Sequence, residues 1–257
     1  MLGAGALGSV KLAHRHDQRG RKFAVKSIPL KNIRPSELLQ FEKEVHLLRS
    51  FDHPNIVRLH EVYKDKSHIH LVTDYCAGGE LFARINEAQH LEEKLVASLA
   101  QQLLFAVSHL HEKNICHRDI KPENFLFVDK FPNCEIKLID FGFAWRYLEE
   151  GGADEAVKAD FVTCSAIEMG LQVRASINST GNNHLLATAP IGIAKREHAL
   201  DIEEASPYFT APEVLQGKVD AKSDIWSLGA ILYMMLCGRA PFEGENNRQI
   251  FKRALRG

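Results

Sequence analysis

The stretch HRDIKPEN at residues 117–124, followed by DFG at residues 140–142, decides how this chain is interpreted. Asp119 can accept the proton of a hydroxyl group. Asn124 and Asp140 carry the oxygen ligands that Mg²⁺ prefers in proteins. Two acids, an amide and the lysine between them therefore indicate a site for phosphoryl transfer.

The composition fits a globular enzyme. The 257 residues include 45% hydrophobic and 25% charged side chains, enough for a two-lobed body with its own core. The formal net charge is −1, so the overall field gives no reason to expect a nucleic acid or an anionic membrane as partner. No apolar run reaches the roughly 18 residues of a membrane span. We therefore expect a soluble chain without a membrane partner.

The cysteines indicate the compartment. They lie far apart and include no C-x-x-C pair, which favours reduced thiols over a disulfide framework or a zinc site. We therefore expect an intracellular, cytoplasmic protein. The cysteines are Cys76, Cys116, Cys134, Cys164 and Cys237.

The chain opens with a glycine-rich turn, LGAGALGSV at residues 2–10, which we expect to form a β-hairpin. Glycines let a backbone approach phosphates closely and point N–H groups at them. A dinucleotide-binding fold uses the same glycine spacing, but it opens a helix there and places an acid about 20 residues on. Residues 21–30 contain no Asp or Glu and supply an apolar strand, FAVKSI at 23–28, that carries Lys26. The alternative to a phosphate-binding role for Lys26 is a solvated lysine on an edge strand.

A helix is expected next, over residues 36–48. Its apolar residues at positions 38, 41, 45 and 48 follow helical spacing. Glu44 lies four residues before Leu48, in the apolar register, which favours it as the acid that faces inward. Glu42 is the competing candidate, since charged residues on a helix usually form a solvated face.

The remaining elements divide between two lobes. Residues 52–59 and 70–75 are predicted as strands that complete a small antiparallel lobe. Residues 95–111 form a long pattern without Pro or Gly, which predicts a helix at the start of a mainly helical lobe. Residues 125–128 and 136–139 are predicted as a hairpin between the two candidate metal ligands.

Together these motifs resemble the catalytic core of eukaryotic protein kinases. The wording GGELF at 78–82, NFL at 124–126 and GRAPF at 238–242 is most similar to the calcium- and calmodulin-dependent protein kinase group, particularly its calcium-dependent members. The resemblance implies an α+β, two-lobed fold. A small nucleotide-binding lobe would span 1–76, and a larger, mainly helical catalytic lobe would span 77–257.

The resemblance assigns catalytic and metal-binding roles. Asp119 would be the base that orients the acceptor hydroxyl, and Lys121 would neutralise the transferring γ-phosphoryl group. Lys26, paired with Glu44, would hold the α- and β-phosphates of ATP. The implied ligands of Mg²⁺ are Asn124 and Asp140.

The nucleotide pocket is assigned in the same way. Thr73 would be the gatekeeper at the back of the adenine pocket, and the main chain of residues 74–76 would be the hinge that hydrogen-bonds adenine. Glu80 would lie near the ribose and help to select basic residues before the target hydroxyl; an exposed acid at a helix start is the alternative. The nucleotide-binding candidates are Leu2, Gly3, Gly5, Gly8, Val10, Ala24, Lys26, Thr73, Asp74, Cys76 and Glu80.

The same resemblance implies protein substrates with Ser or Thr acceptors near basic residues, because Lys121 marks Ser/Thr kinases. Residues 205–213 resemble the substrate-docking segment, in which Ser206 keeps the hydroxyl of the usual threonine and Ala205 replaces the usual glycine. No EF-hand loop with its terminal glutamate occurs, so this chain encodes no calcium sensor. The alternative function is a truncated or pseudokinase-like module that binds nucleotide or partners without turnover.

The chain departs from the family in three places. It begins at the glycine loop, so we expect the first strand of the small lobe to be cut short. Residues 149–204 lengthen the activation segment and hold one aromatic residue, which predicts a flexible insertion. A regulatory insert and translated non-coding sequence are the two interpretations, and we favour the second. The family also continues beyond residue 257, so we expect an incomplete large lobe in which Glu213 lacks its usual arginine partner.

Overall fold

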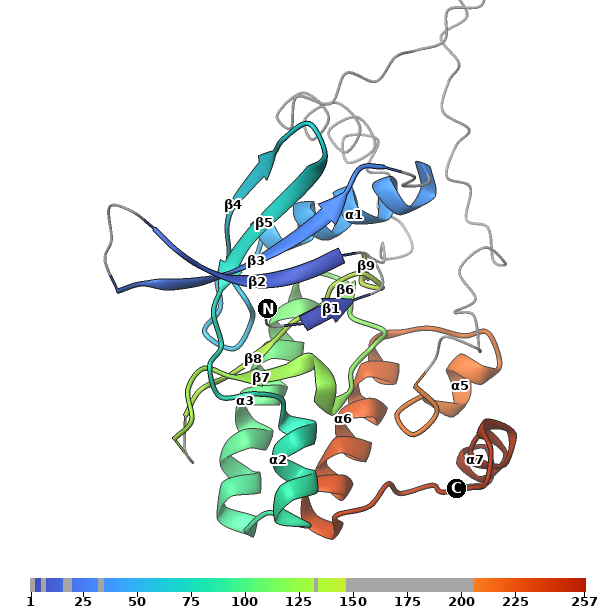
Figure 1. Ribbon diagram of the computed structural model, residues 1–257. Helices are drawn as coiled ribbons and strands as arrows, with labels where there is room; N and C mark the ends of the chain where they lie inside the picture. The colour runs from blue at the N-terminus through green and yellow to red at the C-terminus, as the bar shows by residue number, and fades with distance from the viewer. Residues whose placement is uncertain (1–2, 6–7, 16–19, 32–34, 132–133, 147–205) are drawn as a thin grey trace, which may run out of the picture.

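The structure is a computed structural model, and it describes residues 3–5, 8–15, 20–31, 35–131, 134–146 and 206–257. A small lobe built on a β-sheet is followed by a larger, mainly helical lobe (Figure 1). The α+β, two-lobed fold that the sequence predicts is therefore confirmed.

The small lobe contains an antiparallel sheet with the strand order β1-β2-β3-β5-β4. Its first two strands form the predicted glycine-rich hairpin, with Gly5 opposite Gly8. The inward side chains of the central strands, such as Ile28, Ile69 and Leu71, are buried, so the sheet has one apolar face. The strands are β1 (Gly3–Gly5), β2 (Gly8–His14), β3 (Lys22–Pro29), β4 (Leu59–Lys64) and β5 (His68–Asp74).

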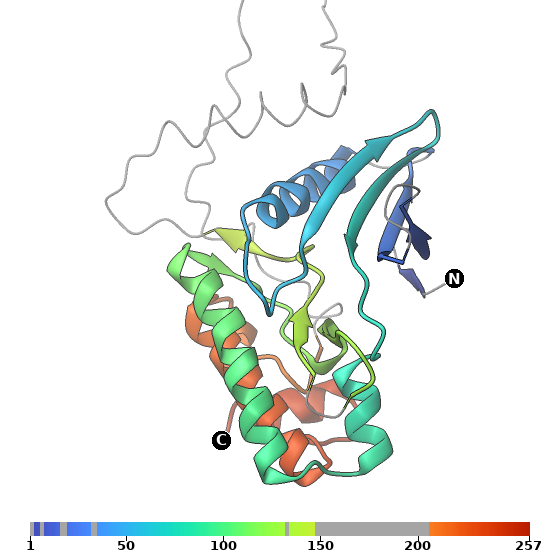
Figure 2. The same ribbon diagram turned by 90° about the vertical axis from the view of Figure 1, so that its left-hand side faces the viewer.

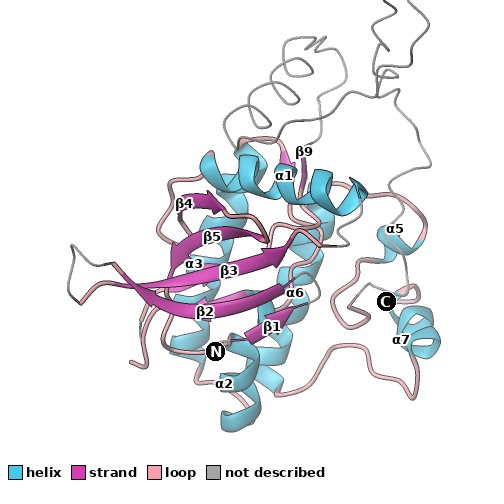
Figure 3. Cartoon of the chain, turned by 45° about the horizontal axis from the view of Figure 1, so that its top comes forward, coloured by secondary structure: helices cyan, strands magenta, loops and turns pink. Residues whose placement is uncertain are grey.

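One helix, α1 (Pro35–Arg49), packs beside this sheet (Figure 3). Phe41, Val45 and Leu48 are buried at helical spacing and join the main hydrophobic core. The apolar register predicted from the sequence is thus confirmed, and it turns Glu44 toward the sheet, where this side chain is buried.

The large lobe is mainly helical, and two of its helices, α3 and α6, lie side by side (Figure 2). Helix α3 covers the range predicted as helical, and β7 pairs antiparallel with β8 as the predicted hairpin. A second short pair joins β6 to β9. The elements are α2 (Leu81–Ala88), α3 (Glu93–Glu112), β6 (Ile115–Cys116), the 3₁₀ turn η1 (Pro122–Asn124), β7 (Phe125–Phe127), β8 (Ile136–Leu138), β9 (Trp145–Arg146), α5 (Pro212–Leu215), α6 (Ala221–Cys237) and α7 (Asn247–Ala254).

The prediction of a strand over residues 52–59 is wrong, because β4 begins only at the last of these residues. Pro54 has no N–H to donate to a ladder. The backbone after it pairs with β8 instead: Leu138 donates its N–H to the Asn55 carbonyl at 2.8 Å, and Val57 donates to the Leu138 carbonyl at 2.9 Å. This segment therefore ties the small lobe to β8 of the large lobe.

Helix α6 has a defined beginning and end. The Asp220 side chain accepts a hydrogen bond from the Lys222 N–H at 2.8 Å and so caps the N-terminus. Gly238 ends the helix with φ at 70°, and a Cβ on this residue would lie 1.7 Å from the Gln89 carbonyl oxygen. Only glycine fits this close approach. These two ends fix the helix that supports the candidate site.

Some expectations lie outside the described residues: those for Leu2, for Ala205 and for the insertion at 149–204. The division into lobes at residues 76 and 77 stays a prediction. Where the chain is described, Cys76, Cys116, Cys134 and Cys237 are free thiols. Within the same residues, no helix combines the length and apolar character needed to cross a membrane.

Candidate active site

The loop between β6 and η1 fixes the position of Asp119. Lys121 Nζ lies 2.7 Å from Asp119 Oδ2, and Asn124 Nδ2 donates to the same oxygen at 3.0 Å. Asn124 Nδ2 also donates to the backbone carbonyl of Asp119 at 2.8 Å. The structure thus brings together the carboxylate, the ammonium group and the amide that the sequence assigned to one site.

The carboxylate of Asp224, on α6, binds the backbone of this loop. Its two oxygens accept the backbone N–H groups of His117 and Arg118, each at 2.9 Å, and His111 Nε2 lies 2.9 Å from Oδ2. Arg118 has φ at 67°, a left-handed conformation that is uncommon outside glycine. Asp224 therefore holds the backbone of this loop in place.

His117 is buried within the loop and is held as a neutral ring. Burial lowers its pKa, although the nearby carboxylates act in the opposite direction. Its Nδ1 accepts the Asp119 N–H at 3.3 Å, so its Nε2 carries the hydrogen that faces the Ile139 carbonyl at 3.3 Å. The ring also meets Phe141 edge-on, with centroids 5.0 Å apart. His117 therefore connects the loop to the residues on either side of Asp140.

Asp140 follows β8 and lies beside the same loop. The Ile139 N–H donates to the Asn124 carbonyl at 2.9 Å, which places the two candidate metal ligands on neighbouring backbones. Asp140 has φ at 62° and is exposed, and its Oδ1 accepts the Gly142 N–H at 3.3 Å. One amide and one carboxylate suit Mg²⁺, which takes few protein ligands and completes its octahedron with phosphate oxygens and water.

Lys26 of β3 and Glu44 of α1 form an ion pair, with Nζ 3.2 Å from Oε1. The Glu44 side chain is 6% exposed, whereas that of Lys26 is 30% exposed. Burial raises the pKa of Glu44, the Lys26 ammonium lowers it, and Asp140 raises it. Of the two competing acids on this helix, Glu44 is the one that contacts Lys26, and Glu42 is only half-buried.

Several nucleotide-binding candidates share one face of the sheet. Val10 lies opposite Lys26, and Ala24 lies opposite Thr73. Directly opposed residues of an antiparallel pair point to the same side, as do residues two apart on one strand. Val10, Ala24, Lys26 and Thr73 therefore line the face that carries the Lys26–Glu44 pair.

The turn between β1 and β2 depends on Gly8. Its φ is 155°, and a Cβ at this position would lie 2.2 Å from the backbone oxygen of Ser27. A side chain would therefore push the hairpin away from β3. Gly3 and Gly5 lie on β1 and complete the hairpin.

The predicted hinge, residues 74–76, leads to a segment that runs along β7 toward α2. The Ala77 N–H donates to Val128 and the Gly78 N–H donates to Phe127, each at 2.9 Å. Thr73 Oγ1 donates to the Asp74 carbonyl at 3.4 Å. Cys76 is half-buried, and Glu80 is exposed at the N-cap of α2. The hinge candidates thus form one strip between the lobes.

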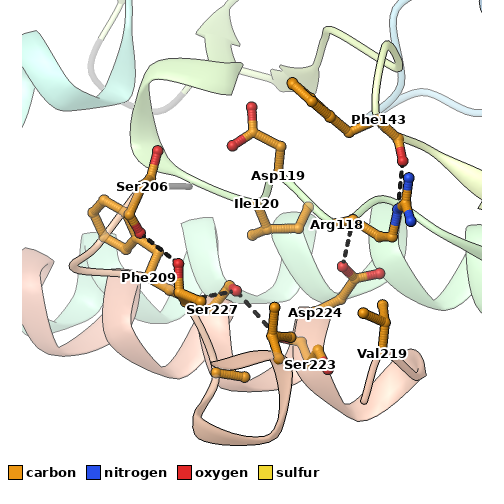
Figure 4. A pocket seen from close by; sticks show the side chains of 13 residues that line it. Arg118, Asp119, Ile120, Phe143, Ser206, Phe209, Val219, Ser223, Asp224 and Ser227 are labelled. Atoms are coloured by element: carbon orange, nitrogen blue, oxygen red, sulfur yellow. Dashed lines mark hydrogen bonds between the residues drawn. The ribbon is translucent and has the colours of Figure 1, made fainter. Parts of the chain in front are cut away.

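A pocket lies between the Asp119 loop and the segment that precedes α5 (Figure 4). Arg118, Asp119 and Ser206 line it together with the start of α6. The segment is held in place by Thr210 Oγ1, which donates to the Ser206 carbonyl at 2.9 Å, and by Ser227 Oγ, which donates to the Phe209 carbonyl at 2.7 Å. The structure thus brings the predicted docking segment to the Asp119 loop.

One acid near the site escaped the sequence interpretation. Within the described residues, the buried Oε2 of Glu123 has no hydrogen-bond partner. Burial raises the pKa of Glu123; its own backbone N–H and the Lys121 ammonium lower it, and the charges of Glu80 and Asp119 raise it. Glu123 belongs to the HRDIKPEN stretch, but nothing in the spacing of the sequence shows that it lies near Glu80.

Comparison with known sequences assigns the chain to a family that agrees with its motifs. The family model described as "Protein kinase domain" matches residues 1–164 and 191–257. The unmatched residues 165–190 lie within the range predicted as an insertion.

Two relatives illustrate the match. Calcium-dependent protein kinase 5 of Plasmodium berghei (strain Anka) is 35% identical over 256 residues, which cover 100% of this chain and 37% of the relative. Calcium/calmodulin-dependent protein kinase type 1 of Macrobrachium nipponense is 33% identical over 258 residues, which cover 100% of this chain and 61% of the relative. The chain thus spans only part of the length of these relatives.

Proposed function

Because the chain belongs to the protein kinase family, as its motifs predicted, we propose that it is an ATP- and Mg²⁺-dependent Ser/Thr protein kinase. The observation that carries the proposal is the pair of contacts on one oxygen of Asp119. Lys121 Nζ and Asn124 Nδ2 lie 2.7 and 3.0 Å from Oδ2. These contacts orient the carboxylate for a substrate hydroxyl.

In the proposed reaction, the hydroxyl oxygen of the acceptor bonds to the γ-phosphorus while the bond from that phosphorus to the ADP oxygen breaks. Asp119 orients the hydroxyl and receives its proton. Lys121 stabilises the negative charge of the transferring group. Lys26, held by Glu44, binds the α- and β-phosphates, and the glycine hairpin covers them.

Asn124 and Asp140 would hold Mg²⁺, which neutralises charge on the β- and γ-phosphates when it is bound. The two side chains fit this ion because both offer hard oxygen atoms from adjacent backbones. The hinge at residues 74–76 would bind the adenine, with Thr73, Val10 and Ala24 against its faces.

The proposed substrates are proteins with Ser or Thr acceptors near basic residues. Glu80 is exposed and Glu123 is close enough to interact with it electrostatically. Two acids together would attract an Arg or Lys side chain, because each carboxylate raises the energy of the other when no cation is present. Ser206 would contact the acceptor side of the site through its hydroxyl.

We also propose a cytoplasmic location, on the strength of the separated thiols. Calcium sensing is not part of the proposal for this chain, since its sequence carries no EF-hand loop.

The proposal is tested by incubating the purified chain with radiolabelled ATP, Mg²⁺ and a basic Ser peptide, with Asp140→Ala as the matched variant. A Tyr version of the peptide checks the acceptor class. We expect label in the Ser peptide only, and only with the parent chain. Equal label with both chains, or none with either while ATP still binds, would favour the module without turnover.

A further inference from the structure

The carboxylate of Asp74, at the end of β5, is contacted by three residues from two separate segments, the start of β4 and strand β8. His60 Nε2 of β4 lies 2.8 Å from Oδ1. Lys137 Nζ of β8 lies 3.2 Å from Oδ2, and the Arg58 N–H donates to the same oxygen at 3.2 Å. The side chains of Asp74, His60 and Lys137 are 22, 17 and 14% exposed, so the cluster is largely shielded from water.

Lys137 extends this cluster into the large lobe. Its Nζ also donates to the Pro54 carbonyl at 2.8 Å and reaches the Ile56 carbonyl at 3.5 Å. Its strand, β8, ends at residue 138, and Asp140 follows two residues later. One ammonium group therefore connects the start of the hinge to the strand that leads to a candidate metal ligand.

The charges in the cluster are well matched. Burial raises the pKa of Asp74, but hydrogen bonding with His60 and the charge of Lys137 outweigh it and leave this pKa below its usual value. Asp74 is therefore ionised at neutral pH. A shielded carboxylate with several partners is costly to leave without them, so the cluster favours one position of the hinge.

We propose that Lys137 and His60, acting through the Asp74 carboxylate, are positioning residues that hold the hinge main chain at a fixed distance from Asp140. The inference rests on the proposed function, in which adenine binds the hinge and the phosphates lie near Asp140. A bound nucleotide spans these two places. A hinge that is free to shift relative to β8 fits the nucleotide less often, which weakens binding.

The cluster differs from an ordinary stabilising ion pair in what its loss affects. Loss of a pair that only stabilises the fold lowers the unfolding temperature and leaves the nucleotide affinity of the folded chain unchanged. Loss of a positioning cluster weakens nucleotide binding while leaving the peptide KM unchanged. The small lobe offers a control in Asp65, which precedes β5, and His70 of β5, whose Oδ2 and Nε2 lie 3.0 Å apart outside the hinge.

The experiment measures the Kd of MgADP by calorimetry and the KM of ATP and of peptide, on chains whose folding is checked by thermal unfolding. The variants are Asp74→Asn, Lys137→Met and, as a smaller change, His60→Gln. We expect the nucleotide Kd to rise about three- to tenfold in each, with the peptide KM unchanged. Lys137→Arg should restore most of the affinity, and Asp65→Asn should bind as the parent does.

The outcomes separate the two proposals. A parent chain that binds no nucleotide would overturn both the proposed function and this inference. A parent chain that binds MgADP while His60→Gln and the other folded variants bind it equally well would overturn the positioning role alone. An equal loss in Asp65→Asn would also overturn it, because the effect would then belong to the small lobe in general.

Discussion

Arg118 donates its backbone N–H to Asp224 Oδ1 across 2.9 Å while its own φ is 67°. A non-glycine residue in this region costs about 1–3 kcal/mol and persists only where the surroundings hold it. Asp224 does so from α6, a helix that follows the loop by about a hundred residues. The orientation of Asp119, the next residue along, therefore depends on a distant helix.

The first prediction concerns this acid. Asp224→Asn leaves one oxygen for two backbone donors, and we expect the free energy of unfolding to fall by about 2–3 kcal/mol. We also expect kcat to fall more than the nucleotide affinity, because the Asp119 loop loses its support. Denaturant unfolding and steady-state kinetics measure the two effects. Asp220→Asn, at the cap of the same helix, is the control, since Asn caps about as well as Asp; equal losses in both variants would contradict the account.

The second prediction concerns the buried acid of α1. Burial raises the pKa of Glu44 from its usual 4.5, so its ionised form is disfavoured in the folded chain. Its contribution to stability is therefore full at low pH and is lost as pH rises from the unfolded pKa through the folded one. The free energy of unfolding of Glu44→Gln should therefore fall less with rising pH than that of the parent. Its kcat should be much lower, because Lys26 loses its partner. Unfolding curves between pH 4.5 and 7, with kinetics at neutral pH, test both statements.

Glu42→Gln is the matched control for this substitution. Burial raises the pKa of Glu42 too, but this side chain is half-buried and lies outside the Lys26 pair. Its kcat should equal that of the parent. A loss of kcat as large as that of Glu44→Gln would show that we have chosen the wrong acid.

The third prediction concerns the glycine hairpin. Gly8→Ala places a methyl group against the Ser27 backbone oxygen, so we expect a loss of about 1–3 kcal/mol in stability together with weaker nucleotide binding. Gly20 also has a positive φ, 112°, but a Cβ there would meet nothing within 4 Å. Gly20→Ala should therefore leave nucleotide binding unchanged. Comparable nucleotide affinities for the two variants would argue against a tight hairpin over the phosphates.

The fourth prediction concerns the thiols. Burial raises the pKa of Cys116 to about 12 and that of Cys76 to about 11, whereas Cys237 is exposed. The thiolate is the reactive form, so iodoacetamide at pH 8 should label Cys237 well before the other two. Peptide mass spectrometry of the native chain gives the order. Early labelling of Cys116 would mean that the core around the Asp119 loop opens readily.

The local parts of the site could be predicted from the sequence because their chemistry is written in short motifs. The HRDIKPEN stretch places Asp119, Lys121 and Asn124 in one short loop and the 3₁₀ turn that follows it, and their contacts follow from that closeness. The apolar register of α1 likewise identified Glu44, because helical spacing determines which face turns inward.

Other features depend on contacts between distant segments, and sequence patterns contain little information about these. The apolar residues after Pro54 predicted a strand, but their backbone pairs with Leu138 of the other lobe. In the same way, nothing in the sequence connects Lys137 with Asp74. The side chains of these two residues meet only in the folded chain, where β8 lies beside the end of β5.

The proposed function depends above all on Asp119 as the base of a phosphoryl-transfer site. Asp119→Asn keeps the size of the side chain but removes the proton-accepting charge. Single-turnover transfer from ATP to a basic Ser peptide should slow by about 10²–10⁴-fold, while MgADP binds with unchanged affinity. Transfer at the parent rate in Asp119→Asn, with nucleotide bound equally well, would contradict the account.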